Sequence, residues 1–377
     1  MFSLPKRASY INLNKVFVDA TNLKYNHESL QAMHPEAEVC PVLKSNAYGH
    51  GLTTVASTFD EFGSPYLVVD SLYEAYALYK LDVKTPILIL GYTDPNNFSV
   101  KSLPFEYAVY DLSVAEALNR FQKGSKIHLF IDTGMHREGI PLPELPSFLE
   151  QLKKLKNLEV VGITSHFADA DNSENMKFVK TQIAEFKKAL ELISKYGYNP
   201  KWKHISASGG AFKVFDPTFN LIRAGLAHYG ITPLEKTDSY YEKIPLKPAL
   251  EFTSTIVQIK ELKKGEYVGY NCTFCAKKQM KIGLLPAGYY EGVDRRLSNK
   301  GLIKVRGKYV SILGRVSMNM TTIDLTDIVD VHVGDQVTIY SANSEDKNSL
   351  VHAAALAGTI PYELLVHLAE SVKREVR

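Results

Sequence analysis

Residues 41–51 read PVLKSNAYGHG, and this stretch raises the question that decides both fold and site. Pro41, Val42 and Leu43 are apolar and are typical of the end of a buried strand, whereas Lys44 begins a polar, turn-forming cluster with two glycines. A lysine at the end of a core strand either extends to solvent along its apolar stem or has a chemical role. The rest of the chain has to decide between these interpretations.

Length and charge limit the class of protein. The chain has 377 residues, enough for two domains with large cores, and its formal net charge of +3 is too small to indicate a nucleic-acid or membrane partner. No apolar run follows residues 1–8 as in a signal peptide, and no stretch approaches the roughly 18 apolar residues of a membrane span. We therefore expect a soluble cytoplasmic protein.

The three cysteines are too few for a disulfide framework. Cys272 and Cys275 form a CxxC motif, but no second CxxC or closely spaced histidine pair accompanies it, as a zinc site would require. A redox motif would normally open a helix, whereas residues 269–275 have the composition of a loop. We favour structural cysteines over redox or metal roles, and we expect no metal site.

Short β-like runs alternate with helical segments through the first two thirds of the chain. The apolar runs lie at 16–20, 39–43, 66–70, 87–91, 107–110, 127–132, 160–167, 204–208 and 221–230. The helical segments between them include 71–81, 113–121, 145–157 and 175–197. Continuous apolar strands separated by helices indicate a parallel sheet covered on both faces. About eight such units in roughly 230 residues favour an α/β fold, a (β/α)8 TIM barrel, over an open doubly wound sheet.

The pattern changes near residue 245, where Pro245 and Pro248 indicate a linker. Strand-like runs follow at 251–262, 280–288, 302–318, 321–326 and 335–341, and then a helical pair at 349–358 and 361–373. We predict a barrel domain over 1–245 and a mostly β C-terminal domain over 246–377. About the first 12 residues are expected to pack with the C-terminal domain.

Sites in barrels of this kind lie at the carboxyl ends of the strands. The polar residues at those ends are Lys44, residues 132–137, His166, Ser206, Ser208 and Arg223. A rim lysine near other cations can act as an amine that forms Schiff bases with carbonyl groups, including that of pyridoxal phosphate. The small-residue turns at 207–210 and 223–226 follow strands, where backbone N–H groups bind phosphate well. Lysine and turns together predict a site for a phosphorylated cofactor.

Seven motifs extend this interpretation. They are PVLKSNAYGHG (41–51), DTGMHREG (132–139), SHFADAD (165–171), IRAGLAHYG (222–230), PAGYYEGVDRR (286–296), GRVSMNM (314–320) and TIPYELL (359–365). In order and separation they resemble the motifs of alanine racemases along nearly the whole chain. The resemblance implies a pyridoxal 5'-phosphate-dependent enzyme that interconverts L-alanine and D-alanine, with cell-wall peptidoglycan as the use of D-alanine.

The resemblance also implies roles for individual residues. The cofactor-binding residues would be Lys44, Tyr48, His166, Ser208, Arg223, Gly225, Leu226 and Tyr362. Arg137, Met318 and Tyr289 of the partner subunit would bind the substrate. Racemisation requires two opposed acid–base groups, and the family implies Lys44 on one face and Tyr270 of the partner subunit on the other. The implied assembly is therefore a homodimer with shared active sites. Arg223 would face the pyridine nitrogen, to which a guanidinium group cannot give a proton.

Four positions depart from the family pattern. They are Phe130, Ala207, Asn271 and Asn319. Phe130 stands where many members have a carbamylated lysine that orients the arginine of DTGxxR. Arg137 must then be held by another group, and the candidates are His128, an anion or Asn319.

These departures leave the substrate range open, so the alternative function is a serine or broad-specificity racemase of the same family. A basic-amino-acid decarboxylase, a non-catalytic pyridoxal phosphate carrier and a barrel with an incidental rim lysine are the less favoured readings. A decarboxylase would give Tyr270 no role. A carrier would resemble the barrel alone, whereas here the β domain carries matching motifs as well.

Overall fold

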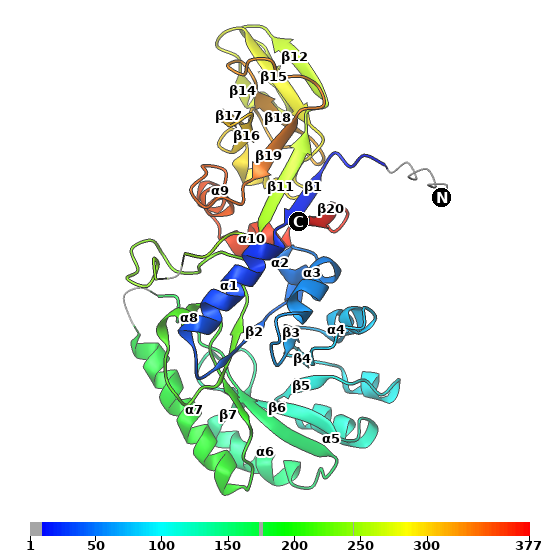
Figure 1. Ribbon diagram of the computed structural model, residues 1–377, viewed down its shortest axis with the longest axis vertical. Coiled ribbons are helices and arrows are strands. Elements are labelled where there is room, and N and C mark those ends of the chain that lie inside the picture. Colours follow the sequence, from blue (N-terminus) through cyan, green and yellow to red (C-terminus); the bar gives the residue numbers. More distant parts are fainter. Residues whose placement is uncertain (1–9, 173–175, 244) are drawn as a thin grey trace, which may run out of the picture. The chain divides into compact units, whose positions relative to one another are not determined.

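The computed structural model describes residues 10–172, 176–243 and 245–377. These divide into two compact units (Figure 1). One consists of Ala20–Pro248, and the other combines residues 10–19 with Ala249–Arg377. The division falls a few residues after the predicted boundary at 245, and the N-terminal segment of the second unit extends beyond the expected first 12 residues to Asp19.

Parallel strands form a closed barrel in the first unit. The strands are β2 (Glu38–Pro41), β3 (Leu67–Val69), β4 (Ile87–Ile89), β5 (Glu106–Val109), β6 (Ser125–Asp132), β8 (Leu158–Thr164), β9 (Trp202–His204) and β10 (Leu221–Ala224), with the short β7 (Ile140–Pro141) beside β6. The hydrogen-bonded orders are β3-β4-β5-β6-β8-β9 and β10-β2. A parallel bridge between Val42 and Val68 joins β2 to β3, and Asn220 N donates to Lys203 O between β10 and β9. The predicted α/β TIM barrel is confirmed.

Helices lie around these strands (Figure 1). Their bounds are α1 (Ala20–Met33), α3 (Leu52–Asp60), α4 (Leu72–Tyr79), α5 (Leu112–Phe121), α6 (Leu145–Leu152) and α7 (Lys177–Lys195), with short turns α2 (Lys44–Tyr48), α8 (Ser208–Lys213), η1 (Pro95–Ser99) and η2 (Leu142–Glu144). Helix α7 buries Val179, Phe186 and Ile193 on one face, as the helical spacing predicts; residue 175, where the helix was expected to begin, lies outside the described residues. None of the helices in the described part of the chain has the length and apolar character needed to cross a membrane.

The second unit is built mainly from antiparallel sheets. Its elements are β1 (Lys15–Val18), β11 (Leu250–Thr255), β12 (Gln258–Leu262), β13 (Tyr267–Val268), η3 (Tyr270–Cys272), β14 (Phe274–Cys275), β15 (Met280–Leu285), η4 (Arg295–Leu297), β16 (Leu302–Val305), β17 (Lys308–Ser311), β18 (Thr321–Asp324), β19 (Gln336–Tyr340), α9 (Leu350–Ala357), α10 (Pro361–Val366) and β20 (Lys373–Val376). The larger sheet has the order β17-β16-β19-β11-β1-β20. The predicted mostly β character of this domain is confirmed.

Three predictions about strands and helices are wrong in detail. The run at 16–20 was assigned to the barrel, but β1 pairs with β11 and β20 in the second unit. The run at 251–262 is two strands, because Val257 N already pairs with Leu284 O and so directs β12 to another sheet. The helix expected over 361–373 ends at Val366, and the Arg374 guanidinium holds the following turn by donating to the carbonyl oxygens of that segment.

Candidate active site

The turn that carries Lys44 has an unusual backbone. Ser45, Asn46, Ala47 and Tyr48 all have positive φ, between 50° and 55°, directly after β2. Each such residue costs roughly 1–2 kcal/mol relative to a right-handed conformation unless it is glycine or asparagine. Consecutive strained residues at one point of a chain are typical of functional sites, where the surrounding structure holds them in place. The left-handed turn therefore marks the position of Lys44 independently of its side chain.

Hydrogen bonds from neighbouring elements hold this turn. Glu74 accepts from Ser45 N at 2.7 Å and from Asp70 N at 2.9 Å, so one carboxylate ties the turn to the end of β3. Asn46 Oδ1 accepts from Leu52 N at 2.7 Å. The Lys44 ammonium lies 3.4 Å from Asp70 Oδ1 and is about one third exposed. The lysine thus projects from the carboxyl end of the barrel beside a carboxylate.

Arg223 on β10 is buried, with 2% of its surface exposed. Its guanidinium donates to Thr164 Oγ1 at 3.0 Å, to Ser165 O at 2.7 Å and to Ile205 O at 3.4 Å. It also hydrogen-bonds the Nδ1 atoms of His204 and of His166, the latter at 3.3 Å. Because guanidinium has no acceptor, both imidazoles must accept. His166 and Arg223, both named above as cofactor-binding residues, are therefore in direct contact.

Burial and charge keep the neighbouring histidine neutral. Burial, together with the positive charges of Arg223, Arg137 and Lys44, lowers the pKa of His166 to about 3. Burial also lowers the pKa of Arg223 to about 10. At neutral pH the arginine is therefore charged and the histidine is not. Lys44, Arg137, His166 and Arg223 lie near or just after the carboxyl ends of β2, β6, β8 and β10, so they share one rim of the barrel.

The predicted phosphate-binding residues also come together. Ser208 Oγ accepts from Gly225 N at 3.0 Å and from Ala227 N at 3.2 Å, which joins the start of α8 to the turn after β10. A Cβ atom at Gly225 would lie 2.3 Å from the hydroxyl of Tyr48, so only glycine allows this approach. Leu226, next in sequence, is buried. Backbone N–H groups at the start of a helix and in such turns suit an anionic group.

Arg137 is held by its neighbour in sequence. The Glu138 carboxylate accepts from Arg137 Nε and, at 2.6 Å, from Nη2, and these bonds raise the pKa of Arg137 above its usual value. Phe130 is buried and is 6.1 Å, centroid to centroid, from the ring of Tyr110. The partner that holds Arg137 is thus Glu138, which was not among the named candidates, and a bound anion stays a prediction.

Of the other two candidates, His128 is wrong, and Asn319 stays a prediction. His128 hydrogen-bonds His204 and Glu106, so both of its ring nitrogens are occupied. Asn319, in the second unit, donates to Glu291 at 2.8 Å.

The remaining predicted residues belong to the second unit. Tyr270 is 67% exposed and begins the turn η3 between β13 and β14. Asn271 follows with φ of 62°, a conformation that asparagine tolerates, which explains its place at a position where glycine is usual. Tyr289 and Met318 line one pocket of about 580 Å³, and Tyr362 lies on α10.

Sequence reasoning missed several residues of the site. They are Asp70, Glu74, Glu138, Thr164 and His204. Asp70 follows an expected strand and His204 lies in one, so their positions at strand ends were the available signal. The cysteines are free, Cys40 buried and Cys272 and Cys275 exposed. In the described ranges no three His, Cys, Asp or Glu side chains gather as metal ligands would.

The fold and the rim define a class of protein: a two-domain chain whose parallel barrel presents a lysine and a buried arginine at its carboxyl end. Residues 18–233 match the model of the alanine racemase N-terminal domain, and residues 249–376 match that of the alanine racemase C-terminal domain. The chain belongs to the alanine racemase family.

Individual relatives agree with this assignment. A protein of Methanococcus maripaludis named alanine racemase is 34% identical over 95% of this chain and 96% of its own length. The alanine racemase structure from Bacillus anthracis with bound L-Ala-P is 30% identical, with a TM-score of 0.89 over 98% of this chain and 96% of that one. The alanine racemase structure from Streptomyces lavendulae is 25% identical, with a TM-score of 0.90 over 98% of both chains.

Proposed function

We propose that this chain binds pyridoxal 5'-phosphate through Lys44 and interconverts L-alanine and D-alanine, with D-alanine used for peptidoglycan. The observation that carries the proposal is the barrel rim, where Lys44 and the buried, donor-only guanidinium of Arg223 lie near the same neutral histidine. The relatives named alanine racemase support alanine as the substrate.

The residues at the rim fit this cofactor. Gly225 admits the Tyr48 hydroxyl where a Cβ would block it, and Ser208 links the start of α8 to the same turn, so the hydroxyls of Tyr48 and Ser208 lie beside one turn as donors for a phosphate. Lys44 would hold the aldehyde through its amine, and the substrate amine would displace that amine and so free it to act as a base. Arg223 suits an unprotonated pyridine nitrogen, because it can donate a hydrogen bond but cannot readily give up a proton. Tyr48, His166, Leu226 and Tyr362 complete the proposed set.

Proton transfer at the substrate Cα requires a group on each face. Bound pyridoxal phosphate withdraws electrons from Cα and so makes its proton acidic. Lys44 Nζ removes or returns that proton on one face, and the hydroxyl of Tyr270 of the partner subunit does so on the other. A single base would return the proton to the face that it left. Arg223, by leaving the pyridine nitrogen unprotonated, limits electron withdrawal and therefore side reactions.

Substrate binding is assigned to Arg137, Met318 and Tyr289 of the partner subunit. Arg137 presents a planar, bidentate donor for the substrate carboxylate, and Glu138 fixes its orientation. The chain acts as a homodimer with shared sites in this proposal. The large exposed fraction of Tyr270 supports that assembly, because an acid–base group needs a surrounding that excludes water.

One experiment tests the proposal directly. Purified protein loaded with pyridoxal phosphate is incubated with L-alanine in heavy water, and D-alanine is followed on a chiral column, with Lys44→Ala as the blank and L-serine and L-lysine alongside. The expected product is D-alanine with deuterium at Cα. Deuterium in L-alanine without D-alanine would mean that Tyr270 is not the second base. Faster turnover of serine or lysine would favour the broad-specificity alternative, which the departure at Phe130 motivates.

A further inference from the structure

Four polar side chains form a continuous hydrogen-bonded series inside the barrel. His128 on β6 lies 3.2 Å from Glu106 Oε2 on β5 and 2.8 Å from His204 Nε2 on β9, and His204 in turn hydrogen-bonds Arg223 on β10. Both histidines are fully buried, and Glu106 and Arg223 are almost so. Barrel interiors are ordinarily filled by apolar, branched side chains. Buried polar and charged groups cost free energy unless they are fully paired, so this hydrogen-bonded series requires an explanation.

The hydrogen bonds of this series all run in one direction, from the donor Arg223 to the acceptor Glu106. Guanidinium can only donate, so His204 Nδ1 accepts and His204 Nε2 must carry the proton. His204 Nε2–H then donates to His128 Nδ1, which leaves the proton of His128 on Nε2. That N–H donates to the Glu106 carboxylate. The charge of Arg223 therefore fixes the tautomer of both histidines, and the Glu106 carboxylate is the final acceptor of the series.

The two ends of the series carry opposite charges. In the part of the chain that the structure describes, the hydrogen-bond partners of Arg223 are hydroxyl, carbonyl and imidazole groups. Burial and the charge of Arg223 lower the pKa of His204, and burial lowers the pKa of His128, so both stay neutral. Burial disfavours the charged form of Glu106, but the hydrogen bonds from His128 and Tyr66 together with the nearby charge of Lys126 outweigh it and lower the pKa of that carboxyl. Glu106 is thus the anion that Arg223 reaches through two imidazoles.

Neighbouring positions make room for the hydrogen-bonded series. Gly162 on β8 is the register partner of His128, and a Cβ atom there would lie 2.0 Å from His128 Nδ1. The hydroxyl of Tyr66 also hydrogen-bonds the Glu106 carboxylate. A glycine that admits the imidazole and a second donor to the carboxylate indicate that the site is built for these groups.

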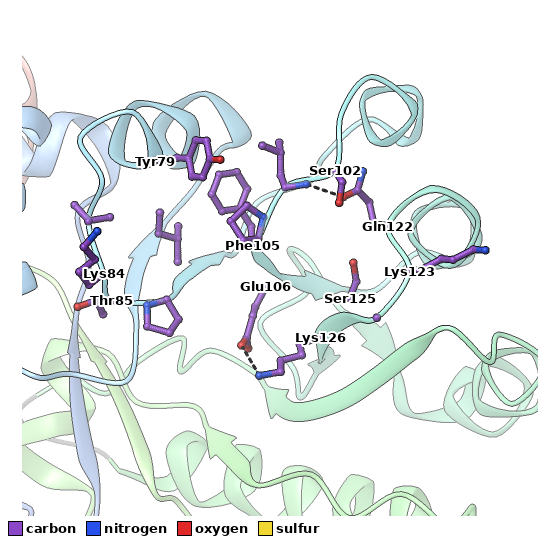
Figure 2. A pocket seen from close by; sticks show the side chains of 16 residues that line it. Tyr79, Lys84, Thr85, Ser102, Phe105, Glu106, Gln122, Lys123, Ser125 and Lys126 are labelled. Atoms are coloured by element: carbon purple, nitrogen blue, oxygen red, sulfur yellow. Dashed lines mark hydrogen bonds and ion pairs between the residues drawn. The ribbon is translucent and has the colours of Figure 1, made fainter.

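The hydrogen-bonded series reaches from one end of the barrel to the other. Glu106 is the first residue of β5, at the amino end of the strands, whereas Arg223 lies near the carboxyl end of β10. Glu106 lines a pocket of about 660 Å³ at its own end, and Figure 2 shows it facing Lys126 there, with Oε1 3.8 Å from the ammonium group. Lys126 is half exposed, so the Glu106 carboxylate is the point where the buried hydrogen-bonded series meets solvent.

We propose that Glu106 and His128 are positioning residues for Arg223: through His204 they fix the orientation and charge of the guanidinium that faces the pyridine ring. The proposal rests on the proposed function, because the ring is that of pyridoxal phosphate. Loss of the Glu106 charge removes the acceptor at the end of the hydrogen-bonded series, so the imidazole of His204 is no longer held, and the guanidinium then turns from the ring nitrogen toward other acceptors or water. The electronic state of the bound cofactor changes although neither residue touches it.

The test uses the holoenzyme and Glu106→Gln, which keeps the shape of the side chain and removes its charge. The absorbance spectrum of the bound cofactor is expected to shift, and kcat to fall about tenfold, in the range seen when outer residues that hold an active-site group are removed. KM is expected to change less than twofold, because the substrate contacts remain. Glu106→Asp is expected to restore part of kcat, and Lys126→Gln, which removes only the exposed partner of Glu106, to leave spectrum and kcat unchanged.

Two readouts separate the possible failures. Borohydride reduction of wild-type holoenzyme followed by peptide mapping shows whether the cofactor is on Lys44. Absence of the cofactor from Lys44 would refute the proposed function and not the buried hydrogen-bonded series. A wild-type spectrum and kcat in Glu106→Gln would overturn the positioning role. If that variant does not fold, the ring-nitrogen chemical shifts of isotope-labelled wild-type protein decide. Nε2–H tautomers at both His128 and His204 support the proposal, and a protonated or Nδ1–H His128 overturns it.

Discussion

Arg223 and Tyr270 are predicted site residues with opposite surroundings. Arg223 is 2% exposed and every hydrogen-bond partner that fixes it comes from the barrel unit, whereas Tyr270 is 67% exposed at the tip of a two-stranded hairpin. The arginine is held for its task before any ligand arrives. The proposed acid–base role of Tyr270 requires another surface to cover it. The proposed function therefore divides the site into a barrel half held within one chain and a Tyr270 half that depends on assembly.

The largest expected effect comes from removing one base from each half. Lys44→Ala and Tyr270→Phe are each expected to lower racemisation by about 10²- to 10⁴-fold, the contribution typical of a positioned acid or base. Mixing the two inactive proteins is expected to restore activity, because a heterodimer contains one site with both bases. The measurement is D-alanine formation after mixing.

The control for this experiment is subunit exchange, followed with differently tagged chains. Exchange without recovered activity would mean that Lys44 and Tyr270 of one chain serve the same site, and the contrast between a complete and an incomplete half would then fail.

The buried half also makes the protein sensitive to acid. Burial lowers the pKa of His166 and His228 to about 3 and that of His27 to about 4, well below the roughly 6.5 of an unfolded histidine. A group whose folded pKa is depressed and which is neutral when folded favours the folded state above the unfolded pKa. That contribution is lost as pH falls below about 6.5, by up to about 1.4 kcal/mol per pH unit for each histidine.

Urea unfolding of the apoprotein at several pH values measures this effect. The free energy of unfolding is expected to fall steeply between pH 7 and pH 5. Replacing exposed His332 with glutamine is expected to leave the slope unchanged, whereas replacing buried His228 with glutamine is expected to reduce it. A flat profile over this range would show that these histidines take up protons in the folded state.

The sequence was sufficient for the parts of the site that depend on strand ends. Lys44 follows the run at 39–43, and His166 and Arg223 lie in the runs at 160–167 and 221–230, and a barrel of parallel strands brings the carboxyl ends of its strands to one rim. The sequence could not reveal that Glu74 would hold the Lys44 turn, because this contact depends on which strands are neighbours. For the same reason the run at 16–20 was placed in the wrong unit: its pairing partners, β11 and β20, lie more than 200 residues away in the chain.

Glu138 gives a smaller effect at the rim of the barrel, where side chains are partly exposed. Glu138→Gln removes the charge that orients Arg137, and KM for alanine is expected to rise about tenfold, or about 1.4 kcal/mol of lost binding, with a smaller change in kcat. Because Phe130 cannot be carbamylated, activity of the wild-type protein is expected to be insensitive to removal of carbon dioxide.

Steady-state kinetics under ambient and carbon-dioxide-free conditions checks both statements. Glu144→Gln, an exposed carboxylate on a nearby turn, is the matched control and is expected to leave KM unchanged. A loss of activity on carbon dioxide removal would mean that another lysine is carbamylated and that Glu138 does not act alone.

The smallest expected effect concerns the left-handed turn, and it shows how the buried half is kept in place. Asn46→Ala removes the acceptor for Leu52 N and places a residue with no preference for positive φ at 55°, so the free energy of unfolding is expected to fall by about 1–2 kcal/mol. Asn46→Asp keeps the acceptor and the tolerance for positive φ, and it is expected to unfold near the wild-type midpoint. Equal destabilisation by both variants would mean that the amide group itself, and not the turn geometry, is what the site requires. If Asn46→Ala alone is destabilised, and loses activity beyond its folded fraction, the strained turn is what aims Lys44 into the barrel rim.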